Sequence, residues 1–306
     1  MGTIKEASII KNEIETTLSG LIAKGDFGFL KRTNIGARAK GFIEGIFLFD
    51  SAPRMMPMAE KKILDVTGSG RSFPGCCCWW AKALSGARGR MERSWWAPRG
   101  GLYLCISLFP QLLPENQQLY GLAAGLSVCQ ALLELGIYGE IRWVNDVLVS
   151  GKKICGILSK GLFAPQTKET YLLFGMGLNV NVKTFPEWLS STATSMEIEL
   201  GRKWQIKDVG ILVISHLVVN FSMLHEWEAW CLRKGVPFHR EENPMMERYK
   251  GLCSLKDRKV LYGRAVEEGG GTPFVSRGIT PNGSIILEDS GGEILLANSG
   301  EIRYLD

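Results

Sequence analysis

The stretch IRWVNDVLVSGKKICGILSKG, residues 141–161, has the pattern of two β-strands joined by a tight turn. Apolar residues dominate both halves, and the pair Ser150-Gly151 between them is a turn signal. We therefore predict a hairpin. Two polar groups flank its turn, since Asn145-Asp146 lies before it and Lys153 lies after it.

These polar residues suit an anionic ligand. An Asn-Asp pair at the end of a strand is suited to Mg²⁺ and to the water molecules around phosphates. Lys153 follows across the turn and is expected to face the same pocket, where it would neutralise a carboxylate that meets an α-phosphate. The alternative is a charged hairpin tip in solvent, which is a common arrangement.

Around the hairpin the chain alternates between buried strands and helices. Apolar runs predict strands at GIFLFD (45–50), CCCWWA (76–81) and Leu102–Phe109, and YLLFGMGLNVNV (171–182) predicts a strand pair interrupted by glycines. One long helix is expected from Pro114 to about Leu135, and another from Asp208 to Arg233, with Gly136 and Gly235 as their stops. The mixture predicts one sheet with flanking helices, in the α/β or α+β class.

Both ends of the chain differ from this central part. Glu6–Lys24 has apolar residues at helical spacing and predicts one amphipathic helix. After Tyr249 glycine and turn residues recur at short intervals, and Asn282-Gly283 is a hairpin signal, so a small all-β barrel is expected there. The predicted organisation is a lead-in segment at 1–44, a larger domain at 45–248 and a small C-terminal β-barrel at 249–306.

Several classes of protein are disfavoured. A helix-turn-helix needs more helices than the first 44 residues indicate, which argues against DNA binding. The charged N-terminus has no secretory apolar core, and no apolar run is of membrane-spanning length, so we expect a soluble cytoplasmic protein without membrane contacts. The formal net charge of +5 is compatible with an anionic ligand.

The eight cysteines have a structural interpretation. None forms a CxxC pair and no histidine lies at ligand spacing from any of them, which argues against a zinc site and a disulfide framework. Cys76, Cys77 and Cys78 are adjacent, so their side chains would alternate across a strand rather than converge. We expect them to be small apolar residues of a buried strand.

Two further motifs carry candidate chemistry. The segment Arg88-Gly89-Arg90-Met91-Glu92-Arg93-Ser94-Trp95 holds three arginines, which grip phosphate or carboxylate oxygens, around a glycine that permits close backbone approach. A solvated basic loop is the alternative. The segment Gly175-Met176-Gly177-Leu178-Asn179 is a strand in which a nucleotide could approach the backbone, or a bulge.

Taken together, RGRxxRxW, WxND…GKKIxGIL, GxGxNxN and Ala193-Thr194-Ser195 resemble, in order and spacing, the motifs of the biotin protein ligase family. The resemblance runs from about Phe47 to the C-terminus, where GRAV…SGEIR resembles that family's small β-barrel. It implies an α+β fold with a mixed sheet and flanking helices, like a class II aminoacyl-tRNA synthetase. The implied activity is ATP-dependent formation of biotinyl-5'-AMP and transfer of biotin to a lysine of a biotin carboxyl carrier protein or carboxylase subunit.

The resemblance also implies roles for particular residues. Lys153, Arg88 and Arg90 would be catalytic, with Lys153 binding carboxylate and α-phosphate oxygens. The loop of Arg88, Gly89 and Arg90 would cover the adenylate, with Trp95 closing it and Gly156 allowing the acyl chain to approach. Asn145, Asp146 and Asn179 would bind ATP, and Asp146 would bind Mg²⁺. Self-association through a sheet edge is left open.

The sequence departs from the family at the positions that reach the ureido ring of biotin. Asp50-Ser51-Ala52-Pro53 replaces the usual Asp-Ser-Thr-Asn, so Ala52 lacks the threonine hydroxyl, and Leu84 replaces a glutamine. The glycine that opens the arginine motif is Ala87, and Arg142-Trp143-Val144 replaces Lys-Trp-Pro. Each lost hydrogen-bond partner would weaken the binding of biotin by about 1–3 kcal/mol.

Three explanations stay open. The pocket satisfies biotin through other groups, or it holds a more apolar acid such as lipoate or a medium-chain fatty acid, or the protein is a non-catalytic relative with a regulatory binding role. The C-terminal barrel favours biotin, because lipoate ligases of this fold do not normally carry it. A sequence-specific, salt-dependent affinity for DNA would favour the regulatory role.

Overall fold

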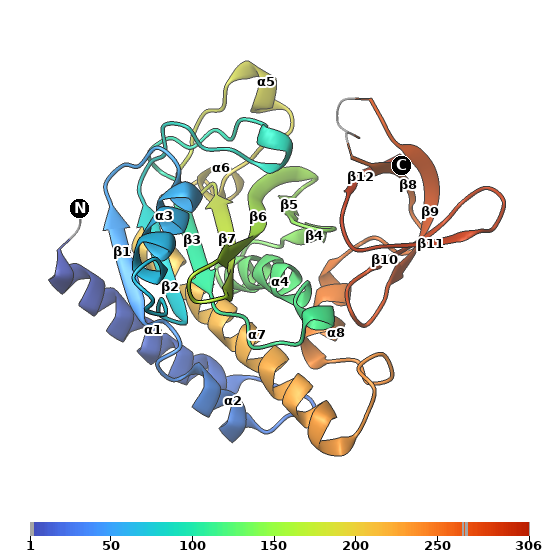
Figure 1. The fold of residues 1–306 in the computed structure, drawn as a ribbon. Coiled ribbons are helices and arrows are strands. Elements are labelled where there is room, and N and C mark those ends of the chain that lie inside the picture. The colour runs from blue at the N-terminus through green and yellow to red at the C-terminus, as the bar shows by residue number, and fades with distance from the viewer. Residues whose placement is uncertain (1–2, 265, 267–268, 306) are drawn as a thin grey trace.

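The computed structural model describes residues 3–264, 266 and 269–305 (Figure 1). Its helices are α1 (Ile4–Lys24), α2 (Arg32–Ala39), α3 (Met55–Thr67), α4 (Leu119–Glu134), α5 (Glu187–Ser190), α6 (Met196–Leu200), α7 (Ile206–Lys234) and α8 (Pro244–Leu252), with 3₁₀ turns η1 (Arg90–Glu92) and η2 (Pro114–Asn116). Its strands are β1 (Gly45–Phe49), β2 (Cys76–Ala81), β3 (Leu102–Leu108), β4 (Glu140–Arg142), β5 (Asp146–Val149), β6 (Lys152–Ala164), β7 (Glu169–Leu178), β8 (Lys259–Gly263), β9 (Thr272–Ile279), β10 (Ile285–Glu288), β11 (Ile294–Ala297) and β12 (Glu301–Tyr304).

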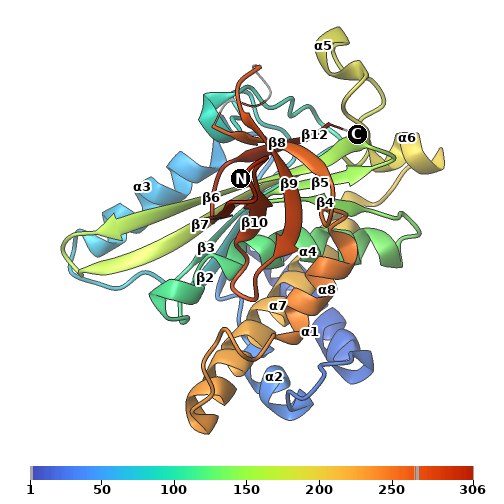
Figure 2. The ribbon, with the colours of Figure 1, turned by 90° about the vertical axis from the view of Figure 1, so that its right-hand side faces the viewer.

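A mixed central sheet organises the larger part of the protein. Its order is β1-β2-β3-β7-β6-β5-β4; β1 and β2 run parallel, and the other neighbouring pairs run antiparallel. Figure 2 shows α1, α2 and α7 on one side of the sheet and α3 on the other. The predicted α+β class with a mixed sheet and flanking helices is therefore confirmed.

Strand β2 shows why the central strands are apolar along their whole length. Cys76, Cys78 and Trp80 pack into the core between the sheet and the α4 and α7 layer. Cys77, Trp79 and Ala81 pack into the second core, beneath α3. A sheet covered on both faces needs apolar residues at consecutive positions. The eight cysteines are free and buried, and burial raises the pKa of each thiol, so all are neutral core groups.

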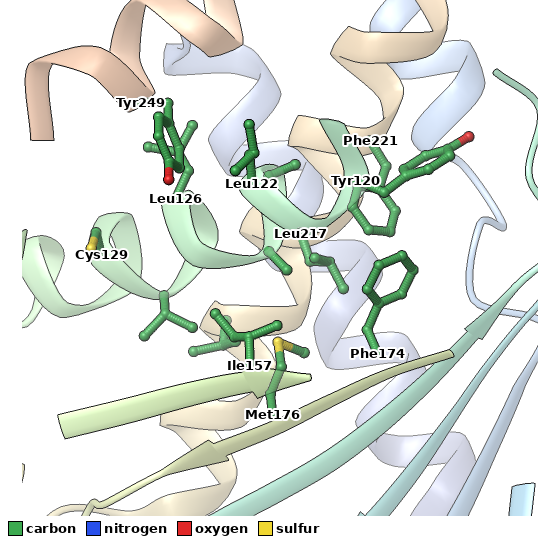
Figure 3. Close-up of a cluster of buried hydrophobic side chains, with 14 of the residues drawn as sticks. Tyr120, Leu122, Leu126, Cys129, Ile157, Phe174, Met176, Leu217, Phe221 and Tyr249 are labelled. Atoms are coloured by element: carbon green, nitrogen blue, oxygen red, sulfur yellow. The ribbon is translucent and has the colours of Figure 1, made fainter. Parts of the chain in front are cut away.

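Helix α7 is the centre of the larger core. Figure 3 shows Leu217 and Phe221 of this helix beside Phe174 and Met176 of β7, with Tyr120 of α4 against Phe221. α7 is the one described helix long and apolar enough to cross a membrane, but 78% of its apolar window is buried inside the protein. Its composition is therefore that of a core helix.

The N-terminal helices belong to this core. The predicted amphipathic helix is confirmed as α1, and α2 follows it without having been predicted. Ile10, Ile14 and Leu18 of α1 and Ile35 of α2 are buried in the core that contains α7. A salt bridge of 3.0 Å between Arg38 and Glu226 also ties α2 to α7. Whether residues 1–44 form a separate unit stays a prediction, but their apolar side chains are packed.

Strands β8 to β12 form an antiparallel sheet in the order β11-β10-β9-β8-β12, as expected for an all-β C-terminal unit. The predicted turn at Asn282-Gly283 joins β9 to β10 and rests on the larger unit. The Trp143 indole donates to the carbonyl of Gly283 at 3.2 Å, and a Cβ on Gly283 would lie 2.4 Å from Leu122 Cδ1. Close approach therefore requires glycine at this turn.

Five details of the sequence prediction need correction. The first long helix begins at Leu119, not Pro114, because Glu228 of α7 holds the amide groups of Leu113 and Asn116. YLLFGMGL is one continuous strand, β7, because β3 and β6 pair with it on both sides. Asn145-Asp146 lies at the start of β5 rather than at a strand end, since residues 143–145 form a turn after β4. Helix α3 was not predicted, and α8 continues beyond Tyr249.

Replacing Gly210 by alanine is expected to destabilise the fold, against the usual gain for such a change in a helix. A Cβ at this position of α7 would lie 2.1 Å from Trp80 Cη2, and Trp80 is fixed in β2. Overpacking of this kind costs about 1–3 kcal/mol of unfolding free energy. In the control, Gly121→Ala in α4, the Cβ meets nothing within 4 Å, and a gain of about 0.5–1 kcal/mol is expected. Urea denaturation measures both; equal effects would contradict this packing.

Candidate functional site

A cavity of about 690 Å³ opens on the central sheet and receives residues from α3, β5, β6, β7, α5 and β12. It contains all of the predicted site residues except Ser51 and Ala52: Leu84, Arg88, Gly89, Arg90, Trp95, Asn145, Asp146, Lys153, Gly156 and Asn179. A second hollow of about 800 Å³, between α1 and the start of α7, contains none of them. We therefore place the candidate site in the first cavity.

Asp146 is the centre of a buried group of charges. Its carboxylate pairs with Lys153 Nζ at 2.5 Å and with Arg142 Nη2 at 2.6 Å. The antiparallel register of β4, β5 and β6 brings these three residues together. Burial alone would raise the pKa of Asp146, but the charges of Lys153 and Arg142 outweigh burial and lower it. The predicted proximity of Lys153 and Asp146 across the turn is confirmed.

This lowered pKa predicts a pH dependence of stability. Because the folded-state pKa of Asp146 lies below its ordinary value of 3.8, the charged pair stabilises the fold fully above that value. The contribution is lost as the pH falls from about 3.8 through the folded-state pKa. The difference in unfolding free energy between the wild type and Asp146→Asn should be constant from neutral pH down to about pH 5 and shrink below it. A difference that grows on acidification would contradict this account.

The arginine loop, defined as residues 88–95, covers one side of the cavity. Arg90 Nη1 reaches Asn145 Oδ1 at 3.4 Å, and Asn145 Nδ2 donates to the carbonyl of Ile157 at 2.6 Å. Arg88 folds back onto its own loop and donates to Ser94 Oγ at 2.8 Å. The structure therefore brings Arg90 to the charged group through Asn145, while Arg88 is held locally.

Two paired glycines form the floor of the cavity. Gly156 of β6 and Gly177 of β7 are direct partners in the sheet. A Cβ on Gly177 would lie 2.7 Å from Trp95 Nε1, and one on Gly156 would lie 3.0 Å from Trp95 Cζ3. The indole lies on this floor with Lys153 Nζ 5.4 Å from its centroid. Only glycine, which has no side chain, leaves room at these two positions for the flat indole of Trp95.

The segment around Ala193-Thr194-Ser195 closes the far side. The backbone of Lys153 accepts from Thr194 N at 3.0 Å and donates to Thr192 O at 2.8 Å. Asn179 Nδ2 donates to the carbonyl of Thr194 at 3.0 Å. Among the described residues, the buried Asn179 Oδ1 has no hydrogen-bond partner. Asn179 is thus placed beside the cavity and holds this segment in position.

The opposite end of the cavity is apolar. Ala52 is buried and forms an isolated bridge with Leu84, so the two predicted positions are neighbours, but only Leu84 lines the cavity. Ser51 is exposed. Met55 and Met56 of α3 join Leu84 at the wall. Sequence reasoning missed these methionines, because α3 itself was not predicted.

Other cavity residues carried no sequence signal. Phe185 and Trp188 line the mouth, and the Trp188 side chain is 61% exposed. Glu301, Ile302 and Arg303 come from β12 of the C-terminal sheet. Short polar or aromatic stretches far apart in the chain look like surface segments until tertiary contacts place them at one cavity.

The predicted Mg²⁺ ligand does not fit the charges around it. Both oxygens of Asp146 already pair with cations, and Glu301, the other acidic residue at the cavity, pairs with Arg93. The described residues contain no cluster of three metal-binding side chains. These residues therefore do not fit a protein-held Mg²⁺; in this fold the ion is expected to arrive with nucleotide phosphates.

Comparisons with known proteins point to the same part of the chain. Residues 81–179, which carry the arginine loop and the hairpin, match the model of the biotin/lipoate A/B protein ligase family. The bifunctional ligase/repressor BirA of Bacillus subtilis is 34% identical over 146 residues, covering 46% of this chain and 43% of that protein. The biotin–[acetyl-CoA-carboxylase] ligase of Mycobacterium tuberculosis is 26% identical over 236 residues, covering 74% and 77%. This chain thus spans less than half of the Bacillus relative.

Solved structures agree on the fold. The biotin protein ligase of Aquifex aeolicus, in complex with biotin and ATP, matches with a TM-score of 0.67 at 22% identity, covering 86% of this chain and 99% of that one. The enzyme of Leishmania major, in complex with biotinyl-5-AMP, matches with a TM-score of 0.53 at 20% identity, covering 83% and 99%. Residues 81–179 of this chain thus match the biotin/lipoate A/B protein ligase family, and the chain has the fold of the biotin protein ligases.

Proposed function

We propose that this protein is an ATP-dependent ligase that converts biotin to biotinyl-5'-AMP and transfers biotin to a lysine of a biotin carboxyl carrier protein or carboxylase subunit. One observation carries the proposal: Lys153, Asp146, Arg142 and the arginine loop meet at a single cavity with a glycine floor. We further propose that the protein acts in the cytoplasm, where it would bind such an acceptor.

In the first step, a carboxylate oxygen of biotin attacks the α-phosphorus of ATP. The bond from that phosphorus to the bridging oxygen breaks, and pyrophosphate leaves with the electron pair. Lys153 supports this step, since it lines the cavity and its side chain is 31% exposed. Ammonium hydrogens aimed at the α-phosphate stabilise the charge that develops there. Asp146 orients that ammonium group, and Arg142 keeps Asp146 ionised.

In the second step, the ε-amine of the acceptor lysine attacks the acyl carbon. The bond from that carbon to the phosphate oxygen breaks, AMP leaves, and a proton from the amine passes to solvent. Water must be kept from the mixed anhydride until the amine arrives. The arginine loop, Trp95 and the α5 residues Trp188 and Leu189 are placed to cover the cavity for that purpose.

The test of the first step is ATP–pyrophosphate exchange on the purified protein with MgATP, run with biotin, lipoate, octanoate and no acid. Exchange that depends on biotin supports the proposal. Transfer is then measured as labelling of an acceptor domain by radioactive biotin. No exchange with any acid, from protein shown to be folded by circular dichroism, would refute a ligase and favour a non-catalytic role.

A ligase for another carboxylic acid is the second candidate. The wall formed by Leu84, Met55 and Met56 favours it, because the side chains there offer no hydrogen bond to a ureido ring. Two lost partners at about 1–3 kcal/mol each would weaken biotin about 30-fold to more than 10,000-fold. Exchange with octanoate or lipoate but not biotin would retain the chemistry and change the substrate.

Leu84→Gln separates the two candidates. If an apolar acid is the substrate, glutamine should lower exchange with octanoate by about tenfold, because a polar amide is buried against an apolar chain. If biotin is the substrate, the new amide should leave exchange with biotin unchanged or improve it. Leu162→Gln, packed on the same core but outside the cavity, controls for loss of stability.

A further inference from the structure

The arginine loop is tied to the C-terminal sheet, about two hundred residues away in sequence. Arg90 Nη1 donates to the carbonyl of Gly300 at 2.6 Å. Arg93 forms a salt bridge with Glu301, the first residue of β12. These contacts join the loop over the cavity to a strand of a different sheet.

The salt bridge is shielded from solvent. The side chain of Glu301 is 10% exposed and that of Arg93 is 32% exposed. The second carboxylate oxygen of Glu301 is buried and has no hydrogen-bond partner among the described residues. Arg93 is therefore the described partner on which this carboxylate depends, and a buried charge that loses its partner is costly.

The loop needs such a tie, because its own conformation is strained. Met91 and Glu92 both have positive φ angles, of 53° and 56°. Non-glycine residues in this left-handed region persist only when the surrounding structure holds them there. Within the loop, Gly89 N donates to Arg93 O at 2.8 Å, but the side chain of Met91 is 55% exposed and packs little. Arg93 therefore closes this strained turn, because its carbonyl accepts the hydrogen bond from Gly89.

The contacts continue from the loop to the charged group. Arg90 reaches Asn145 Oδ1, and Asn145 in turn donates to the carbonyl of Ile157 in β6. The guanidinium group of Arg90 therefore lies between Gly300 of the C-terminal unit and Asn145 of the turn between β4 and β5. Burial lowers the pKa of Arg90, because the hydrogen bonds to Gly300 and Asn145 replace only part of the water that its guanidinium group has lost.

We propose that Glu301 is a positioning residue: through Arg93 it holds the arginine loop closed over the cavity, so that the C-terminal sheet is a structural part of the active site. The consequence for catalysis rests on the proposed ligase function. The consequence for the loop does not, because it concerns only the conformation of the ligand-free protein.

The test compares Glu301→Gln, which preserves shape and removes the charge, with the wild type. Brief trypsin digestion followed by mass spectrometry measures cleavage after Arg88, Arg90 and Arg93. We expect cleavage there to be about tenfold faster in the variant, the effect of losing a charged hydrogen bond. With an active substrate, the adenylate should also escape into solution about tenfold faster, while KM for ATP changes less.

Matched variants make the result specific. Glu288→Gln breaks the 2.8 Å salt bridge with Arg277 in the same C-terminal sheet; neither residue lines the cavity, and this variant should digest like the wild type. Arg93→Glu combined with Glu301→Arg rebuilds the pair with reversed charges, and cleavage after Arg88 and Arg90, the sites that remain in this variant, should again be slow relative to either single reversal.

Wild-type cleavage rates in Glu301→Gln would overturn the proposal. Cleavage spread through the C-terminal sheet would also overturn it, because Glu301 would then support that sheet rather than the loop. If the wild type shows no exchange with any acid, the ligase function fails, and the digestion still decides whether Glu301 holds the loop.

Discussion

Replacing Lys153 by alanine should abolish adenylate formation, by about 1,000-fold or more, and leave the fold intact. The ammonium group of Lys153 reaches the cavity from β6, and removing such a group from a developing charge costs about 100- to 1,000-fold. The attacking carboxylate and the phosphate would then also repel one another without compensation.

The fold is expected to survive because Lys153 contributes its backbone, not its side chain, to the sheet. Its amide donates to Thr192 O and its carbonyl accepts from Thr194 N. Asp146 would retain Arg142 at 2.6 Å, so its charge would not be left unpaired. Pyrophosphate exchange and thermal unfolding are measured together. Lys152→Ala, the exposed neighbour on the same strand, is the control and should behave like the wild type. Normal exchange by Lys153→Ala would show that the site lies elsewhere.

Replacing Gly177 by valine is expected to remove exchange activity by a different route, through loss of space. A Cβ there would already lie 2.7 Å from the Trp95 indole nitrogen, and two further methyl groups would extend over the paired Gly156. Displacing a bound reactant by about 1 Å costs about 100-fold in rate. Valine is favourable in a strand, and the indole that it would displace belongs to the arginine loop rather than to the core, so stability should change less than activity.

Substrate binding separates this effect from unfolding. KM for the acid should rise in Gly177→Val while the midpoint of thermal unfolding stays within a few degrees of the wild type. Gly161→Val adds the same side chain to β6 at a position with nothing within 4 Å, and serves as the control. Unchanged kinetics in Gly177→Val would mean that the ligand does not lie over the glycine floor.

Much of the local structure and most of the site were predictable from the residues alone. The apolar run at Cys76–Ala81 predicts a strand buried on both faces, and Asn282-Gly283 predicts a hairpin, because both signals act through the backbone of a few neighbouring residues. The turn at Ser150-Gly151 placed Lys153 opposite Asp146 for the same reason. The order of the motifs then indicated the family.

Tertiary structure decided what surrounds those residues. Helix α3 brings Met55 and Met56 to the cavity, Glu228 delays the start of α4, and β12 reaches the arginine loop. No local pattern encodes these contacts, because each depends on how surfaces far apart in the chain pack together.

The sequence by itself predicted which polar groups line the candidate site. Packing decided which of them meet: it pairs Asp146 with two cations, turns the Ala52 position away from the cavity and couples Arg93 to Glu301. The physical reason is that turns and strands arise from interactions within a few residues, whereas a cavity exists only where several elements fail to fill the space between them.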